Sequence, residues 1–401
     1  MNTLSNIFFI LELALLIYLG FAAIYFFVFA FASLFYQEKQ NGTGSKKYKI
    51  VVLIPSYKED NVIIETAKSA MQHVSSRSQL EVIVIADSLM PETIKELKNT
   101  GTNVLPVSFE KSTKVKSMNK ALNVIGNDYD YVVVLDADNI MEKDFIDKLI
   151  NRLEQGYRII QGHRTAKNSN TNFAVLDGIS EEVNNSIFRK GHSFFGLSAS
   201  VIGSGFICEF SLFKNLISRS TAVGGFDKEM ELKLIEQKIR IGYANNALVY
   251  DEKIQHPDAF INQRRRWLSA QLIYCRKNLK SSFVQLFKYG NIDYFDKVIQ
   301  YLLPPRIITL GITFAVAFFY LTFALIKGAE SVSLSLYMWI GLFVLSSLSI
   351  LISIPARMFG IRLLKSLWSL PKGFILFMFA LIKVKGANKK FIHTAHGITR
   401  K

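Results

Sequence analysis

Apolar residues are unevenly spread along the chain, and the longest apolar runs lie towards its two ends. Residues 6–36 are almost uninterrupted apolar sequence, broken only by Glu12. Two further runs, 307–326 and 334–354, approach the roughly 20 residues that a helix needs to cross a bilayer. The pattern therefore predicts three membrane-spanning helices. The run at 374–382 is too short to span and predicts an interfacial or re-entrant segment.

Between these runs, strand-like and helix-like patterns alternate from residue 49 to residue 135. The strands are short apolar runs rich in β-branched residues, and turn signals separate them from amphipathic stretches. The predicted strands are 49–55, 80–86, 103–107 and 131–135, and the predicted helices are 61–73, 92–99 and 116–125. Such alternation is typical of an α/β fold with a mostly parallel sheet covered by helices.

Two acidic residues follow the last of these strands, at the edge where open α/β sheets bind their ligands. They form the stretch Asp136-Ala137-Asp138. Two hard oxygen ligands one residue apart suit Mg²⁺ or Mn²⁺ holding a diphosphate, although an isolated pair of this kind is also common in solvated turns. The same edge should carry residues 55–59 and Asp87, each of which could instead cap the helix that follows it.

Composition narrows the classes of protein to consider. The 401 residues are 50% hydrophobic and carry a net charge of +16. No zinc, helix-turn-helix or RNA-binding signature accompanies that charge, so membrane lipids and an anionic substrate explain it better than nucleic acid. No Gly-x-Gly-x-x-Gly or Gly-Lys-Ser/Thr loop follows the first strand, which argues against a dinucleotide-binding or P-loop protein. Cys208 and Cys275 have no metal-binding spacing and are expected to be reduced.

Positive charges indicate how the chain lies in the membrane. No Lys or Arg precedes the first apolar run, whereas Lys39, Lys46, Lys47 and Lys49 follow it, and further basic residues lie beyond residue 356. We therefore predict a retained anchor with its N-terminus outside, and a cytoplasmic middle and C-terminus. The expected divisions are a first span (1–36), a linker (37–47), a soluble domain (48–275), an interfacial amphipathic segment (276–304), two spans (305–356), and an interfacial or re-entrant segment with a basic tail (357–401).

Four motifs lie along the soluble domain. They are Pro55-Ser56-Tyr57-Lys58-Glu59, Lys114-Val115-Lys116-Ser117-Met118-Asn119, Asp136-Ala137-Asp138 and Gln263-Arg264-Arg265-Arg266-Trp267. Together they resemble the nucleotide edge, the Lys-x-x-x-Leu-Asn element, the metal-binding Asp-x-Asp and the Gln-x-x-Arg-Trp motif of membrane-embedded members of glycosyltransferase family 2. That group includes cellulose, hyaluronan and poly-N-acetylglucosamine synthases. Met118 stands where the family usually has Leu.

The resemblance implies a GT-A-type domain and assigns roles to these residues. Those expected to bind the nucleotide sugar are Pro55, Tyr57, Glu59, Asp87, Lys114, Asn119 and Asp136. Those expected at the acceptor or the diphosphate are Gly203, Ser204, Gly205, Gln263, Arg266 and Trp267. Asp138 is expected to bind Mg²⁺ or Mn²⁺. The simpler alternatives are a plain turn at residues 203–205 and a basic helix at the lipid headgroups for residues 263–267.

The expected catalytic base departs from the family pattern. Counting back from Gln263 by the family's spacing brings the base to Asp227. Phe226 then stands where the family has Glu. Glu229 and Glu231 follow at strand or helix spacing, and they remain alternatives if the register differs.

As a whole, the resemblance implies an inverting, metal-dependent enzyme of a bacterial inner membrane. It would move a sugar from a nucleotide-diphosphate sugar, expected to be a UDP-sugar, to a growing polysaccharide. Transfer of one sugar to a lipid or another acceptor is the alternative. A transporter would need charged residues within its spans, and only Glu12 is charged there. Three spans offer little material for a polysaccharide pore, so self-association or an export partner is expected.

Overall fold

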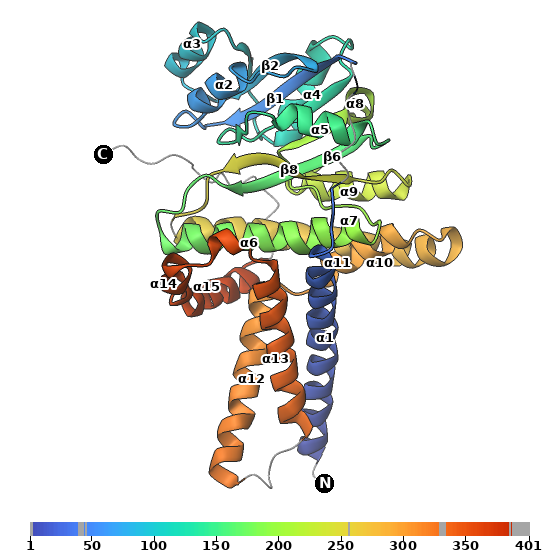
Figure 1. The fold of residues 1–401 in the computed structure, drawn as a ribbon, viewed down its shortest axis with the longest axis vertical. Helices are drawn as coiled ribbons and strands as arrows, with labels where there is room; N and C mark the ends of the chain where they lie inside the picture. The colour runs from blue at the N-terminus through green and yellow to red at the C-terminus, as the bar shows by residue number, and fades with distance from the viewer. Residues whose placement is uncertain are drawn as a thin grey trace.

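The computed structural model describes residues 3–38, 44, 46–255, 257–328, 334–384 and 386. These residues form three layers along the long axis of the molecule (Figure 1). The first layer is a β-sheet with its covering helices, the second is a set of helices lying across the molecule, and the third is three long helices that run away from it. Lys39, Lys385 and the end of the basic tail lie outside the described residues.

A mixed sheet of eight strands organises the first layer. The strands are β1 (Tyr48–Tyr57), β2 (Ser78–Asp87), β3 (Asn103–Val107), β4 (Tyr131–Val134), β5 (Ile140–Met141), β6 (Ile159–Ala166), β7 (Phe206–Glu209) and β8 (Gly242–Asp251). Their order is β3-β2-β1-β4-β7-β6-β8-β5. The first four in that order are parallel, as are β6 and β8, whereas β7 is antiparallel to both its neighbours and β5 to β8. The predicted α/β fold with a mostly parallel sheet is confirmed.

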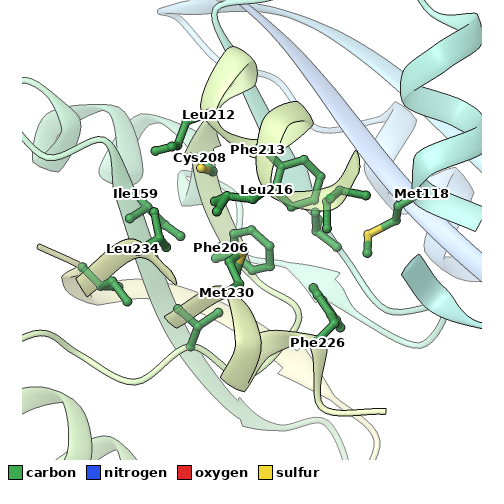
Figure 2. Packing of buried hydrophobic residues seen from close by; sticks show 14 of the residues in the cluster. Met118, Ile159, Phe206, Cys208, Leu212, Phe213, Leu216, Phe226, Met230 and Leu234 are labelled. Carbon is green, nitrogen blue, oxygen red and sulfur yellow. The ribbon is translucent and has the colours of Figure 1, made fainter. Parts of the chain in front are cut away.

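Both faces of the central strands are buried, which explains why β1, β2 and β4 carry apolar residues at successive positions. The covering helices are α2 (Ile63–Met71), α3 (Pro91–Asn99), α4 (Lys114–Val124), α5 (Phe145–Leu153), α8 (Phe210–Ser218) and α9 (Phe226–Glu236). Side chains alternate between faces along a strand. Val51 and Leu53 pack with α4, α8 and α9, whereas Ile50 and Ile54 pack with α2, α3 and α5. Figure 2 shows the first cluster around Phe206.

The second layer consists of helices lying across the molecule beneath the sheet (Figure 1). They are α6 (Asn172–Asn185), the π-helical turn η1 (Ser186–Gly191), α7 (His192–Phe194), α10 (Pro257–Tyr289), α11 (Ile292–Leu302), the 3₁₀ turn η3 (Ala356–Met358), α14 (Ile361–Leu367) and α15 (Leu370–Ile382). Helix α10 is continuous over 33 residues, so the expected domain boundary at residue 275 falls inside it. A single continuous helix therefore joins residues before this boundary to the expected interfacial segment.

The third layer consists of α1 (Thr3–Ser33), α12 (Arg306–Lys327) and α13 (Leu334–Ser353). All three are long and apolar enough to cross a membrane, and the bent pair α14–α15 would make a fourth span if it counted as one. The three predicted spans coincide with these helices. Glu12, inside α1, accepts a hydrogen bond from the Trp339 indole of α13 at 2.9 Å. This bond satisfies a carboxylate that would be costly to leave unpaired in lipid.

Candidate active site

Asp136 and Asp138 directly follow β4, beside the ends of β1 and β2. The Asp136 carboxylate pairs with the Lys114 ammonium, and the Asp136 N–H donates to Asn139 Oδ1 at 3.2 Å. Asp138 is buried and accepts hydrogen bonds from the Glu252 N–H at 2.9 Å and from the Asn139 amide at 3.3 Å. The Asp136 side chain is 35% exposed. The Asp138 carboxylate is therefore fixed by hydrogen bonds, whereas the Asp136 carboxylate is partly exposed to solvent.

This pair of carboxylates suits a metal that is held partly by its substrate. Within the described residues, no three His, Cys, Asp or Glu side chains form a closed metal cluster. Mg²⁺ bound to substrate phosphates commonly uses only one or two carboxylates. The hydrogen bonds from Asn139 and Glu252 orient Asp138 and leave acceptor capacity on its oxygens. Asp136 and Asp138 thus fit Mg²⁺ or Mn²⁺ bound together with a diphosphate.

Lys114 connects the two sides of the site. Helix α4 begins at this residue, two residues earlier than predicted, because the Thr113 side chain caps it by accepting from the Lys116 N–H. Besides pairing with Asp136, the Lys114 ammonium donates to the Gly203 carbonyl at 2.8 Å. It also lies 5.4 Å from the centre of the Phe226 ring. The residue that replaces the family's Glu therefore packs against this lysine.

The ends of β1 and β2 form the other part of the edge. Tyr57 and Asp87 are register partners there. The buried Asp87 carboxylate accepts hydrogen bonds from Ser112 at 3.0 Å and from Ser117 at 3.2 Å. Lys58 has a positive φ of 56° and donates its N–H to the Asp87 carbonyl at 3.1 Å. These bonds hold the end of β2 to the start of α4.

Three further residues expected at the nucleotide sugar also lie along this edge. Pro55 is partly exposed in β1, the Glu59 carbonyl accepts from the Ile63 N–H at 3.1 Å, and Asn119 is partly exposed on α4. Helices α2 and α3 have apolar residues, Val62 and Met90, at their N-cap positions. Neither residues 55–59 nor Asp87 therefore supplies the N-cap side chain considered as their simpler role.

Asp227 lies on the first turn of α9, beside the glycine loop that precedes β7. A β-carbon added at Gly203 would lie 3.8 Å from the Asp227 β-carbon. Burial raises the pKa of Asp227 above its usual value, and the charges of Lys228 and Lys114 oppose that increase while Glu231 adds to it. A carboxylate with a raised pKa is a better proton acceptor than an ordinary aspartate.

The two alternative carboxylates of α9 already have other partners. Glu229 accepts from the Ser220 hydroxyl and pairs with Lys233 at 2.7 Å. Glu231 is fully buried and accepts from the Val201 N–H and the Tyr301 hydroxyl. Both therefore hold the fold around α9, and Asp227 is the one beside Gly203.

Gly203, Ser204 and Gly205 form a tight loop between the site and β7. Gly203 and Gly205 have positive φ angles of 78° and 62°. A methyl group added at Gly205 would lie 2.5 Å from Val249 Cγ1, so both conformation and space require glycine there. The Ser204 hydroxyl is buried and has no hydrogen-bond partner within the described residues. The Gly205 N–H donates to the Val134 carbonyl at 2.7 Å, which anchors the loop to β4.

Helix α10 brings the remaining motif to the site from the second layer. Burial lowers the pKa of Arg266, and the charge of Asp136 opposes that effect, so Arg266 lies within electrostatic range of Asp136. Trp267 is 39% exposed, and its ring lies 4.4 Å from the Arg264 guanidinium. The Gln263 side-chain oxygen is buried without a hydrogen-bond partner in the described part of the chain. Of these three motif residues, Arg266 is thus the one on which the charge of Asp136 acts.

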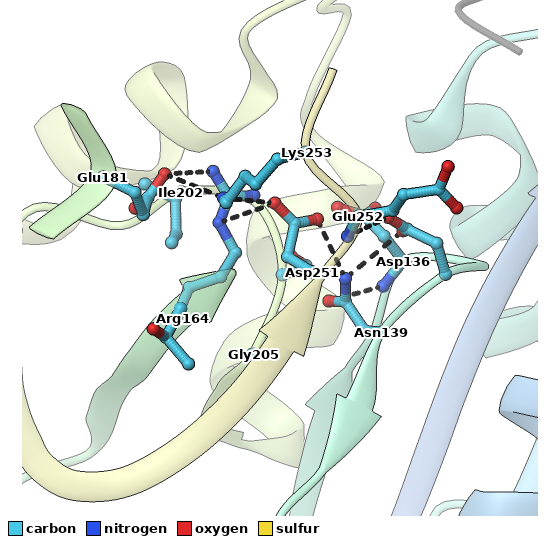
Figure 3. Close-up of polar contacts among 12 residues, drawn as sticks. Asp136, Asn139, Arg164, Glu181, Ile202, Gly205, Asp251, Glu252 and Lys253 are labelled. Atoms are coloured by element: carbon cyan, nitrogen blue, oxygen red, sulfur yellow. Dashed lines mark hydrogen bonds and ion pairs between the residues drawn. The ribbon is translucent and has the colours of Figure 1, made fainter. Parts of the chain in front are cut away.

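A charged network that was not predicted from the sequence links Asn139 to Asp251, Lys253 and Arg164 (Figure 3) and supports Asp138. The Asn139 amide nitrogen lies 3.3 Å from both Asp138 Oδ1 and Asp251 Oδ1. Asp251 pairs with Lys253 at 2.7 Å and with Arg164 at 3.6 Å. Burial opposes ionisation of Asp251, but these two cations hold its pKa below the usual value. The sequence feature that could have indicated this network is Asn139, the polar residue directly after Asp138.

A family model matches the part of the chain that contains the candidate site residues. The model is described as Glycosyltransferase like family 2, and it matches residues 48–270, more than half of the chain. No curated protein matches the chain significantly.

Solved structures that the chain matches include two enzymes. A mannosyltransferase from Pyrobaculum calidifontis, solved with GDP-mannose and Mn²⁺, has a TM-score of 0.51 and 13% identity over 85% of this chain and 96% of its own. Glucosyl-3-phosphoglycerate synthase from Mycobacterium tuberculosis, solved with Mn²⁺, UDP and glucosyl-3-phosphoglycerate, has a TM-score of 0.40 and 14% identity over 57% of this chain and 80% of its own. The first similarity shows a shared GT-A-type fold.

Proposed function

This chain belongs to Glycosyltransferase like family 2, and from that premise we propose that it transfers a sugar from a UDP-sugar to a growing polysaccharide with inversion at the anomeric carbon. The observation that carries the proposal is the position of Lys114. Its ammonium contacts both Asp136 and the Gly203 carbonyl, and Gly203 lies against Asp227. Lys114 therefore connects two parts of the site. Asp136 lies on the part suited to the sugar donor, and Gly203 and Asp227 lie on the part suited to the acceptor.

On the donor side, the site must bind a nucleotide diphosphate and stabilise it as it leaves. Asp136 and Asp138 would hold Mg²⁺ or Mn²⁺, which when bound neutralises charge on the diphosphate. Lys114 and Arg266 add positive charge beside Asp136. Tyr57 lies at the neighbouring strand end, and the nucleotide would lie between it and α4.

On the acceptor side, Asp227 takes the proton from the attacking hydroxyl. The acceptor oxygen then forms its bond to the anomeric carbon as the bond from that carbon to the diphosphate breaks, and the diphosphate leaves with the electron pair. One displacement inverts the configuration. Gly203 and Gly205 let a sugar approach the backbone, and Trp267 offers an exposed aromatic face on which it can stack.

We further propose that the enzyme resides in a bacterial inner membrane with residues 48–275 in the cytoplasm. Support comes from the lysines that follow α1 and from three helices able to cross a membrane. Cys208 and Cys275 are buried, so a cysteine introduced at exposed Lys98 is a better reporter of topology. It should react with an impermeant thiol reagent only after permeabilisation. Labelling in intact cells would refute the cytoplasmic assignment.

The acceptor is tested by supplying radiolabelled nucleotide sugars one by one to the membrane-embedded protein and sizing the product. A long polymer from one UDP-sugar is the expected result. Addition of a single sugar to a lipid would refute polymer synthesis while leaving glycosyl transfer intact.

Three spans are few for export of such a polymer, so we expect self-association or a partner to complete its path. Long polymer inside sealed vesicles from monomers at high dilution would contradict that expectation.

A further inference from the structure

A group of buried polar atoms without partners lies where α10 and the start of α12 approach each other. Within the described chain, such atoms include Gln263 Oε1 and Arg264 Nε on α10, and Arg306 Nη1 and Thr309 Oγ1 on α12. Arg264 is 6% exposed and Thr309 is 1% exposed. Buried polar atoms are nearly always hydrogen-bonded in folded proteins. Their concentration on two short stretches therefore indicates that a ligand completes this region.

The two stretches face each other. The charges of Arg264 and Arg306 are close enough to repel. Leu268, one turn beyond Arg264, packs in the same apolar cluster as Ile308 of α12 and Phe377 of α15. The start of α12 and this part of α10 therefore line one region, bounded by α15.

This region has more positive charge than its carboxylates neutralise. Asp177 of α6 pairs with Arg264. Arg306 donates only to neutral groups, the Ser180 carbonyl at 3.3 Å and the Asn184 side-chain oxygen at 2.8 Å, and makes no ion pair within the described residues. Arg306 is only partly exposed, and a partly buried guanidinium without a paired anion is unfavourable.

The other nearby carboxylate is already shared. Glu181 contacts Arg164 at 2.9 Å, Arg189 at 3.3 Å and Lys253 at 3.7 Å. These cations hold the pKa of Glu181 well below its usual value in spite of its burial. Glu181 is thus shared among these three cations, and its charge acts on Arg306 without an ion pair between them in the described residues.

The position of this region identifies the source of an anion. Arg306 is the first residue of α12, a helix long and apolar enough to cross a membrane, and part of its surface is exposed. The second layer lies across the upper end of α12 (Figure 1). A residue at the start of a span lies at the level of lipid headgroups, whose phosphates arginine binds with two parallel hydrogen bonds.

We propose that Arg264, Arg306 and Thr309 form a binding site for a phosphate group, supplied by the headgroup of a membrane lipid. Arg266, two residues after Arg264, lies instead within electrostatic range of Asp136. The site requires α12 to lie in a membrane but requires no particular sugar or acceptor.

The test is native mass spectrometry of the full chain in detergent, titrated with phosphatidic acid or with phosphate-free diacylglycerol. The wild-type protein should bind phosphatidic acid more tightly than diacylglycerol. Arg306→Gln should weaken that binding at least about tenfold, as expected for charge-assisted hydrogen bonds, and Thr309→Val about threefold. Arg362→Gln removes the same charge from an exposed position of α14 and should leave binding unchanged.

Two further measurements separate the outcomes. If inorganic phosphate alone binds with the same dependence on Arg306 and Thr309 and phosphatidic acid does not, the anion site stands and its source is soluble. Equal binding of phosphatidic acid by wild type and Thr309→Val, or by wild type and a folded Arg306→Gln, overturns the site. UDP binding, measured in parallel, should not change in either variant, so failure of this site is distinguishable from failure of the proposed activity.

Discussion

At the residue scale, the choice of base follows from what each carboxylate of α9 already contacts. Asp227→Asn should lower kcat by about 10²–10⁴-fold with the fold intact, because it removes the proton acceptor beside Gly203. The matched control is Glu229→Gln, which loses only contacts with Ser220 and Lys233 and should change kcat little. Initial rates and circular dichroism of both variants check this. A severe loss in the control with near-normal Asp227→Asn would exclude Asp227 as the base.

The pH dependence of the reaction follows from the same residue. Burial raises the pKa of Asp227 above its ordinary value of 3.8. Because the base acts deprotonated, kcat/KM should fall as the pH is lowered through that raised pKa. The charge of Lys228 opposes the shift, so Lys228→Gln should move the acidic limb to higher pH, whereas Lys233→Gln should not. Identical pH–rate profiles for wild type and Lys228→Gln would contradict this interpretation.

At the scale of elements, glycine permits the first span to contact the second layer. A methyl group added at Gly191 of η1 would collide with the Phe29 carbonyl of α1. Gly191→Ala should therefore lower the unfolding free energy by about 1–3 kcal/mol, the usual cost of overpacking. Gly341→Ala in α13 meets no atom within 4 Å and should be neutral or slightly stabilising. Thermal unfolding in detergent compares them, and equal destabilisation would show that η1 and α1 do not depend on this contact.

Elements differed in how well the sequence predicted them. β3 matches its predicted range, and β1, β2 and β4 differ by a few residues, because apolar β-branched runs buried on both faces leave a strong local signal. The short antiparallel β7 was not predicted, since its four residues follow a glycine loop and its pairing with β4 depends on residues far away in the chain. The length of α10 was also not predicted. Its apolar residues pack against different elements along the helix, Leu268 with α12 and α15 and Ala270 with α9, so they form no single apolar stripe.

At the scale of the whole molecule, α10 lies between the sheet layer and the long apolar helices (Figure 1). The charge of Asp136 at the sheet edge acts on Arg266, and Arg264 pairs with Asp177 of α6 in the second layer. The motif residues could be named from the sequence because they are local. Their partners could not, since the carboxylate that pairs with Arg264 is separated from it by 87 residues and carries no motif. The same holds for Asp251, which supports Asp138 across the sheet edge.

The central claim is that Asp136 and Asp138 bind the donor diphosphate through a divalent metal. Its most direct test is sugar transfer from the UDP-sugar by purified wild type and Asp138→Asn, each with Mn²⁺ and with excess chelator, alongside a thermal unfolding curve. We predict transfer only by wild type with Mn²⁺, and a folded Asp138→Asn that is inactive in both conditions. Full activity of Asp138→Asn in chelator would contradict the account.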